Sequence, residues 1–180
     1  MRWLAKFIYH KILGWKVTGF NDFDSVKKCV LIAAPHTSWH DFYIGVLLRS
    51  VTGIKANFVG KKALFKWPFG WFFKAMGGTP VERKSNENQV DAIARLFNNK
   101  EVFRMALAPE GTRKKVDEWR TGFYYIAKAA DVPIVMFTLD FGKKENRFSE
   151  PFYATDDQEA DFKYIRAFYE GVVGKVPEYS

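Results

Sequence analysis

Residues 29–41 read Cys29-Val30-Leu31-Ile32-Ala33-Ala34-Pro35-His36-Thr37-Ser38-Trp39-His40-Asp41, an apolar run followed at once by polar side chains. The apolar part is short and uninterrupted, which is typical of a buried strand. A second, mostly apolar run, residues 102–108, is followed in the same way by Pro109 to Arg113. In an open α/β sheet, ligands bind beyond the carboxyl ends of the strands. We therefore expect the two polar segments to form a site at one edge of a sheet.

The rest of the chain alternates between strand-like and helix-like patterns. Strands are expected at 29–34, 56–59, 79–82, 102–108 and 133–141, and helices at 1–15, from Ser38 to Gly53, at 86–99, at about 121–130 and at about 157–172. Ser38 is the expected cap of one helix, and Ser85 or Asn86 of another. This alternation predicts a single α/β domain over residues 1–180, with a mixed, mainly parallel sheet flanked by helices.

The composition points to an anionic partner. Lys and Arg number 28 against 20 Asp and Glu, a net charge of +8, which suits a phosphate-bearing substrate, lipid head groups or nucleic acid. The aromatic residues, 18% of the chain, cluster with Leu and Met in one block instead of being spaced as stacking platforms. We therefore expect no nucleic-acid partner. Cys29 is the single cysteine, so no disulfide forms within the chain, and its apolar neighbours favour a place in the core.

Two segments suit a membrane surface. In residues 1–15, apolar side chains recur at three- and four-residue steps between basic ones, which predicts a helix lying in the membrane plane or packed on the domain. Residues 64–76 form an aromatic block that includes Trp67, Phe69, Trp71, Phe72 and Phe73, and Pro68 and Gly70 exclude one long helix there. No stretch approaches the roughly 20 apolar residues of a spanning helix. We expect a peripheral, monotopic protein on the cytoplasmic face of a membrane with anionic lipids.

His36 and Asp41 are the first candidates for chemistry. A histidine titrates near neutral pH and suits a general base, and a carboxylate on its other ring nitrogen fixes the tautomer. The five-residue spacing brings them together if His36 lies in the strand-end loop and Asp41 in the first helical turn. The alternatives are a structural loop histidine and, for residues 109–113, a turn with a surface ion pair. His40-Asp41 also suggests a metal phosphohydrolase, but with three histidines in the chain we expect no metal site.

Taken together, these segments resemble the ordered motifs of glycerolipid acyltransferases. The matching segments are His36-x4-Asp41, Gly60-Lys61-Lys62 with Gly78-Thr79-Pro80-Val81-Glu82-Arg83, Pro109-Glu110-Gly111-Thr112-Arg113 and Val132-Pro133-Ile134-Val135. The resemblance covers roughly residues 15–145 and is greatest to the 1-acylglycerol-3-phosphate acyltransferase class.

The resemblance implies transfer of a fatty acyl group from an acyl thioester, on coenzyme A or acyl carrier protein, to a lysophospholipid hydroxyl. The favoured acceptor is 1-acylglycerol-3-phosphate, giving phosphatidic acid, with no further cofactor. His36 would be the base and Asp41 its orienter. The glycerol-phosphate would be held by Lys61, Arg83, Glu110, Gly111, Thr112 and Arg113, and the acyl side would be shaped by Val132, Pro133 and Ile134. The aromatic block would contact the acyl chain or the membrane.

The chain departs from the family pattern at two positions. Pro35 stands where Asn commonly precedes the histidine, and Ala108 stands where Phe commonly precedes Pro109. These departures bear on the acceptor more than on the reaction. They leave open an acyltransferase for another lysolipid, such as one that contains an amino acid, and a lipid-binding protein without catalysis is the further alternative.

Overall fold

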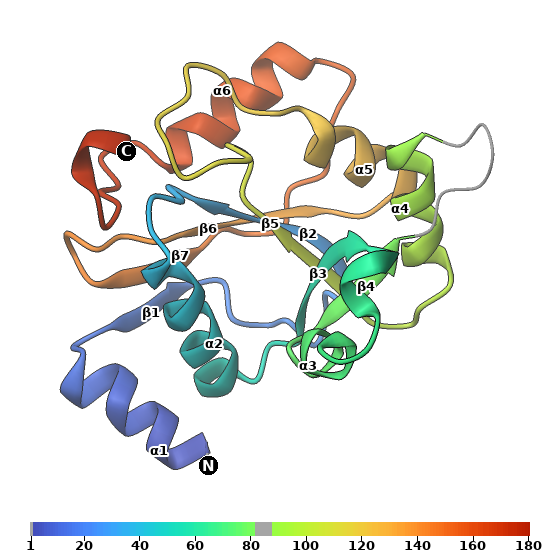
Figure 1. The fold of residues 1–180 in the computed structure, drawn as a ribbon. Helices are drawn as coiled ribbons and strands as arrows, with labels where there is room; N and C mark the ends of the chain where they lie inside the picture. Colours follow the sequence, from blue (N-terminus) through green and yellow to red (C-terminus); the bar gives the residue numbers. More distant parts are fainter. Residues whose placement is uncertain (1, 82–87) are drawn as a thin grey trace.

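The computed structural model describes residues 2–81 and 88–180, and it confirms the mainly parallel α/β fold (Figure 1). The described strands form one 7-stranded sheet in the order β1-β7-β6-β2-β5-β3-β4. Their bounds are β1 (Lys16–Gly19), β2 (Lys28–Ala34), β3 (Ala56–Lys61), β4 (Gly78–Val81), β5 (Phe103–Leu107), β6 (Ile134–Thr138) and β7 (Glu145–Phe148). β6 and β7 are antiparallel, and the other neighbours are parallel.

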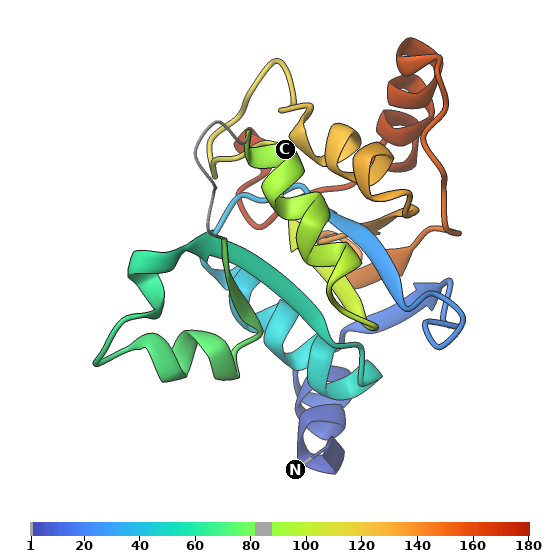
Figure 2. The ribbon, with the colours of Figure 1, turned by 90° about the vertical axis from the view of Figure 1, so that its right-hand side faces the viewer.

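Helices cover both faces of the sheet (Figure 1). They are α1 (Arg2–Lys6), continued by the π-helical turn η1 (Phe7–Ile12), α2 (His40–Thr52), η2 (Lys62–Phe65), α3 (Gly70–Ala75), α4 (Gln89–Asn98), α5 (Gly122–Ala130), α6 (Gln158–Phe168) and η3 (Pro177–Tyr179). α4, α5 and α6 lie on one face, and α1 and α2 lie on the other. The segment that holds η2 and α3 projects away from the body beside β3 (Figure 2).

Each face has its own core. Under α4, α5 and α6, large side chains such as Phe97, Phe103 and Phe123 pack against β2, β5 and β6. Under α2, Ile44 and Leu48 pack with Tyr9 and Trp15 from the N-terminal segment. β2 contributes to both cores, because alternate residues of a strand point to opposite faces. Its uninterrupted apolar sequence is thus explained by burial on both sides.

The structure corrects several local expectations. The outer strand β1 and its neighbour β7 were not expected, since both are only four residues long and carry polar side chains. The expected caps Ser85 and Asn86 lie outside the described residues, and α4 is capped instead by Asn88, whose side chain accepts from the N–H of Asp91. Gly53 ends α2 as expected, in a left-handed conformation (φ 82°) that glycine adopts without strain.

Candidate active site

His36 and Asp41 form a pair in the structure. His36 lies in the loop after β2, and Asp41 lies in the first turn of α2. His36 Nδ1 lies 2.9 Å from Asp41 Oδ2, and the same oxygen accepts hydrogen bonds from the N–H groups of Thr37 (2.9 Å) and Ser38 (3.0 Å). A carboxylate only accepts, so this contact places the imidazole proton on Nδ1. The other ring nitrogen, Nε2, is then the one that can take up a proton. The exposed fraction of the side chain is 27% for His36 and 2% for Asp41.

Asp41 also explains how the loop turns into α2. The N-cap residue is Trp39, and its side chain makes no capping hydrogen bond. The expected cap, Ser38, accepts from the N–H of His40 (3.3 Å) and contacts its ring (2.9 Å). The main anchor of the loop is therefore the Asp41 carboxylate, which binds the two preceding amides as well as His36.

Glu110 contacts the loop that carries His36 from the side of β5. Its carboxylate accepts from the main-chain N–H of His36, with Oε1 at 3.1 Å and Oε2 at 3.3 Å. Burial raises the pKa of Glu110 above its ordinary value, and the hydrogen bond from His36 opposes that shift. The two polar segments therefore meet as expected, because β2 and β5 are parallel neighbours. However, Glu110 contacts the main chain of the candidate base, whereas the resemblance implied contact with the acceptor.

The C-terminal segment supports the same loop from another side. The N–H of Val176 donates to Thr37 Oγ1 (3.1 Å), and the Thr37 side chain is buried. Gly174 packs so closely that an added Cβ would lie 2.7 Å from Thr37 Oγ1. No local sequence pattern indicates this contact, since the partners are 139 positions apart.

Gly111, Thr112 and Arg113 continue the turn that begins at Glu110. Gly111 has a φ of +66°, a conformation that glycine adopts freely and that a residue with a Cβ adopts only with strain. Thr112 Oγ1 accepts from the N–H of Lys114 (3.3 Å), and Arg113 is exposed to solvent.

The other two basic candidates are only partly described. Lys61 is the last residue of β3, which pairs with β5, so its main chain lies at the same edge of the sheet. Its side chain is not among those described, and Arg83 lies outside the described residues.

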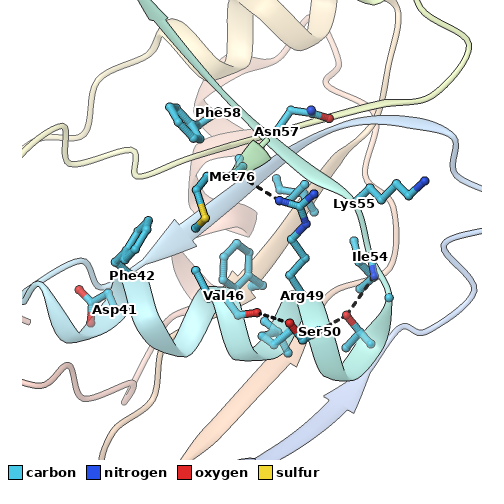
Figure 3. Close-up of a pocket in the computed structure, with 18 of the residues that line it drawn as sticks. Asp41, Phe42, Val46, Arg49, Ser50, Ile54, Lys55, Asn57, Phe58 and Met76 are labelled. Atoms are coloured by element: carbon cyan, nitrogen blue, oxygen red, sulfur yellow. Dashed lines mark hydrogen bonds between the residues drawn. The ribbon is translucent and has the colours of Figure 1, made fainter. Parts of the chain in front are cut away.

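A cavity of about 530 Å³ runs between α2 and the sheet (Figure 3). Asp41 lies at one end of its lining and Ile54, just after α2, at the other (Figure 3), so the cavity follows α2 along most of its length. The lining is mostly apolar and includes Leu31, Phe42, Gly45, Val46, Phe58, Met76, Ala106, Phe137 and Phe148. Arg49 also lines it, and its Nη1 donates to the carbonyl oxygen of Met76 (2.9 Å). This volume is typical of small-molecule sites.

The structure does not bring Val132, Pro133 and Ile134 to this cavity. Ile134 is opposite Val30 in the register of β6 and β2, near the amino end of both strands. His36 follows the carboxyl end of β2, so the three residues lie at the far side of the sheet. They are buried in the core instead. The expected acyl contact rested on the order of the motifs along the chain, and this order does not tell which end of a parallel strand a residue occupies.

The model of the Acyltransferase family matches residues 15–139 of this chain. The chain belongs to that family. The structure is also similar to the crystal structure of the 1-acyl-sn-glycerophosphate acyltransferase PlsC from Thermotoga maritima, with a TM-score of 0.57 and 18% sequence identity. The similarity covers 93% of this chain and 74% of the PlsC chain. At this identity it shows a shared fold. A search of curated proteins gave no match.

In this acyltransferase, the N-terminal helix and the segment around α3 each expose several large apolar side chains. On the N-terminal helix, Trp3, Leu4, Phe7 and Ile12 are exposed, whereas Tyr9 is buried and donates to Asn146 Oδ1 (2.6 Å). One side of this helix therefore packs on the domain and the other faces outward, while its place in a membrane plane stays a prediction. Around α3, the exposed side chains are Trp67, at 92%, Phe69, Trp71 and Phe72, while Phe73 is half-buried.

The described residues were also expected to hold no membrane-spanning helix, no metal site and no reactive cysteine. Within 2–81 and 88–180, no helix has the length and hydropathy to cross a bilayer. Over the same ranges, no group of three or more His, Cys, Asp or Glu side chains converges as metal ligands would. Cys29 is buried, and burial raises the pKa of its thiol to about 12, which disfavours the thiolate.

Proposed function

We propose that this protein transfers a fatty acyl group from an acyl thioester to the hydroxyl of a lysophospholipid. The donor is acyl coenzyme A or acyl carrier protein, and the favoured acceptor is 1-acylglycerol-3-phosphate, which gives phosphatidic acid. One observation carries the proposal: the His36–Asp41 pair, 2.9 Å apart, stands at the end of an apolar cavity that Asp41 itself lines. Membership of the Acyltransferase family supports the type of reaction.

In the proposed reaction the two ring nitrogens of His36 have different roles. Nδ1–H stays bonded to Asp41, and Nε2 takes the proton of the acceptor hydroxyl as its oxygen attacks the thioester carbonyl. Asp41 stabilises the imidazolium that forms. When the tetrahedral intermediate collapses, the carbon–sulfur bond breaks and the leaving thiolate receives the proton from Nε2. The new ester and the free thiol balance the reaction, and no metal or other cofactor is required.

The acyl chain of the donor or the acceptor would occupy the cavity beside α2. An extended apolar chain buries its surface there, and this burial is favourable by about 25 cal/mol per Å². The cavity ends next to Asp41, so a chain seated in it would have its polar end at the His36 loop. This placement replaces the expected acyl contact with residues 132–134.

The head group would lie on the other side of His36, at the turn after β5. Arg113 offers a planar, always charged fork that suits a phosphate. Lys61 and Arg83, the expected further contacts, remain proposals of the same kind. The main-chain N–H groups of Thr37 and Ser38 bind Asp41 and are therefore not available to stabilise the thioester oxyanion.

The same proposal gives the protein a membrane partner. Its acceptor is amphiphilic, and the exposed aromatic side chains of α1 and of residues 67–72 suit insertion at head-group level, with lysines beside them for anionic lipids. We place the protein as a peripheral, monotopic enzyme on the cytoplasmic face.

A donor and acceptor screen tests the proposed function. The purified protein is incubated with palmitoyl coenzyme A or palmitoyl acyl carrier protein and with 1-acylglycerol-3-phosphate, other lysophospholipids or an amino-acid-containing lysolipid, and diacyl products are measured by mass spectrometry. We expect phosphatidic acid as the main product. Transfer only to the amino-acid-containing lysolipid would overturn the acceptor, and binding of lysolipid without any transfer would overturn the enzymatic role.

A further inference from the structure

Arg120 lies over the turn at Gly111, although it is nine positions further along the chain. A Cβ added at Gly111 would stand 2.5 Å from Arg120 Nε and 2.8 Å from Cδ. The guanidinium group therefore occupies the space that a side chain at position 111 would fill. Gly111 is thus required twice, once for its positive φ and once to admit Arg120.

The main chain around Arg120 is anchored to both strands that carry the site. The N–H of Arg120 donates to the carbonyl oxygen of Pro109 (2.9 Å), directly after β5. The preceding residue, Trp119, stacks edge-on against Tyr169, with ring centroids 5.3 Å apart. The hydroxyl of Tyr169 donates to the carbonyl oxygen of Ile32 in β2 (2.6 Å). The main chain at Arg120 is therefore anchored, and its side chain extends from this anchored position over the Gly111 turn.

The Arg120 side chain is exposed and has no acidic partner in the described part of the chain. The carboxylate at the start of the Gly111 turn, Glu110, accepts from the main-chain N–H of His36. A guanidinium stays charged at all ordinary pH values and offers two parallel donors to a phosphate. The Arg120 guanidinium lies over Gly111, the residue that follows Glu110, and it has no acidic partner among the described residues. It is thus suited to bind an anionic group of the substrate.

We propose that Arg120 binds the phosphate of the acceptor head group together with Arg113, and that it sets the preference for anionic acceptors. This inference rests on the proposed acyl transfer to a lysophospholipid. Arg120 contacts the phosphate and not the reacting atoms, so it contributes to acceptor binding more than to the chemical step. Two cations on either side of the Gly111 turn would hold the head group next to the His36 loop.

Steady-state kinetics of Arg120→Gln test the inference. With 1-acylglycerol-3-phosphate we expect KM to rise about tenfold or more, the loss of one charge-assisted bond, while kcat changes less than about twofold. With the uncharged acceptor monoacylglycerol, the change in kcat/KM should be absent. Arg120→Lys should recover part of the loss, since a point charge replaces the fork. Lys27→Gln, which removes one positive charge before the amino end of β2, is the matched control and should leave kinetics unchanged.

Equal effects of Arg120→Gln on both acceptors, or no effect on either, would overturn the role of Arg120. A direct titration with glycerol 3-phosphate, followed by NMR, reads head-group binding without turnover. We expect wild type to bind it more tightly than Arg120→Gln, and equal affinities would contradict the inference. Absence of transfer by wild type would instead refute the proposed function, so the two failures are distinguishable.

Discussion

The two faces of the sheet are built differently. On the face covered by α4, α5 and α6, aromatic and aliphatic side chains fill the space, and Phe97, Phe103 and Met105 have no exposed surface. On the face covered by α2, a cavity of about 530 Å³ remains between helix and sheet. Gly45 and Arg49 help to leave this space open. Gly45 has no side chain, and an added Cβ would meet nothing within 4 Å, while Arg49 is drawn to the carbonyl oxygen of Met76.

The contrast teaches how one sheet serves two purposes. The filled face fixes β2 and β5, and with them the positions of His36 and Glu110 that follow these strands. The hollow face accepts a flexible apolar chain without opening the core that holds the strands. Substitutions on the two faces should therefore have different consequences, stability on one and substrate choice on the other.

The largest effect is expected for Phe97→Ala on the filled face. Removing a fully buried ring leaves a cavity, and the free energy of unfolding should fall by about 3–5 kcal/mol. Urea unfolding monitored by circular dichroism measures this change. The preference of the folded fraction for acyl chain length should stay as in wild type, and a shifted preference would show that the filled face also contacts substrate.

Gly45→Leu on the hollow face should act in the opposite way. The new side chain enters open space in the cavity, and leucine favours the helix more than glycine, so stability should not fall. Transfer with long-chain thioesters should fall about 10- to 200-fold, whereas short-chain donors are retained.

Gly45→Ala is the matched control, because it adds only one methyl group, and it should give an intermediate shift. Activity of Gly45→Leu with long-chain donors within twofold of wild type would mean that the cavity does not hold the acyl chain.

Thr37→Val tests the loop that follows β2 and carries His36. The change removes the acceptor of the Val176 N–H, and unfolding should become easier by about 1–2 kcal/mol. The rate of transfer should fall several-fold, since the loop that carries His36 loses one support. Thr37→Ser keeps the hydroxyl and should restore both values; a Ser variant as impaired as Val would point to the methyl group instead.

The smallest effect concerns the pH dependence of stability at Glu110. Its pKa is raised in the folded protein, so the folded state holds this proton more tightly than the unfolded chain does. Stability of wild type should therefore decline, relative to Glu110→Gln, as the pH rises from below the ordinary carboxyl pKa through the raised one. The glutamine oxygen still accepts from the N–H of His36. Urea unfolding of both proteins between about pH 4 and 6.5 measures this change, and a wild type that gains stability relative to Glu110→Gln as the pH rises would contradict this sign.

Much of the sheet was predictable from the sequence because its central strands are buried on both faces. The runs before His36 and before Pro109 are apolar throughout or nearly so, and each became a strand within one or two residues. The outer strand β1 and its neighbour β7 were not predicted because their pairing is set by tertiary contact. Lys16 faces Glu145 across that pair, and neither sequence shows the alternation of a half-buried strand.

For the site, the sequence predicted the residues better than their contacts. His36 and Asp41 form the expected pair, because only a short loop and the first turn of α2 separate them. The partner of Glu110, the support from Val176 and the place of Arg120 depend on long-range packing. The sequence carries one sign of the cavity beside α2, which is Gly45 within the apolar and aromatic stretch of residues 42–48, and its meaning becomes clear only with the sheet in place.

The most direct test of the account compares His36→Ala with His40→Ala. His40 is the matched control, a neighbouring histidine whose ring contacts Ser38 and stacks on Trp39. Thiol release from palmitoyl coenzyme A, dependent on 1-acylglycerol-3-phosphate, is followed with a chromogenic thiol reagent, and circular dichroism verifies the fold. We expect His36→Ala to lose about 10²- to 10⁴-fold in kcat while His40→Ala stays within a few-fold of wild type. A folded His36→Ala protein that retains transfer within a few-fold of wild type would contradict the central claim.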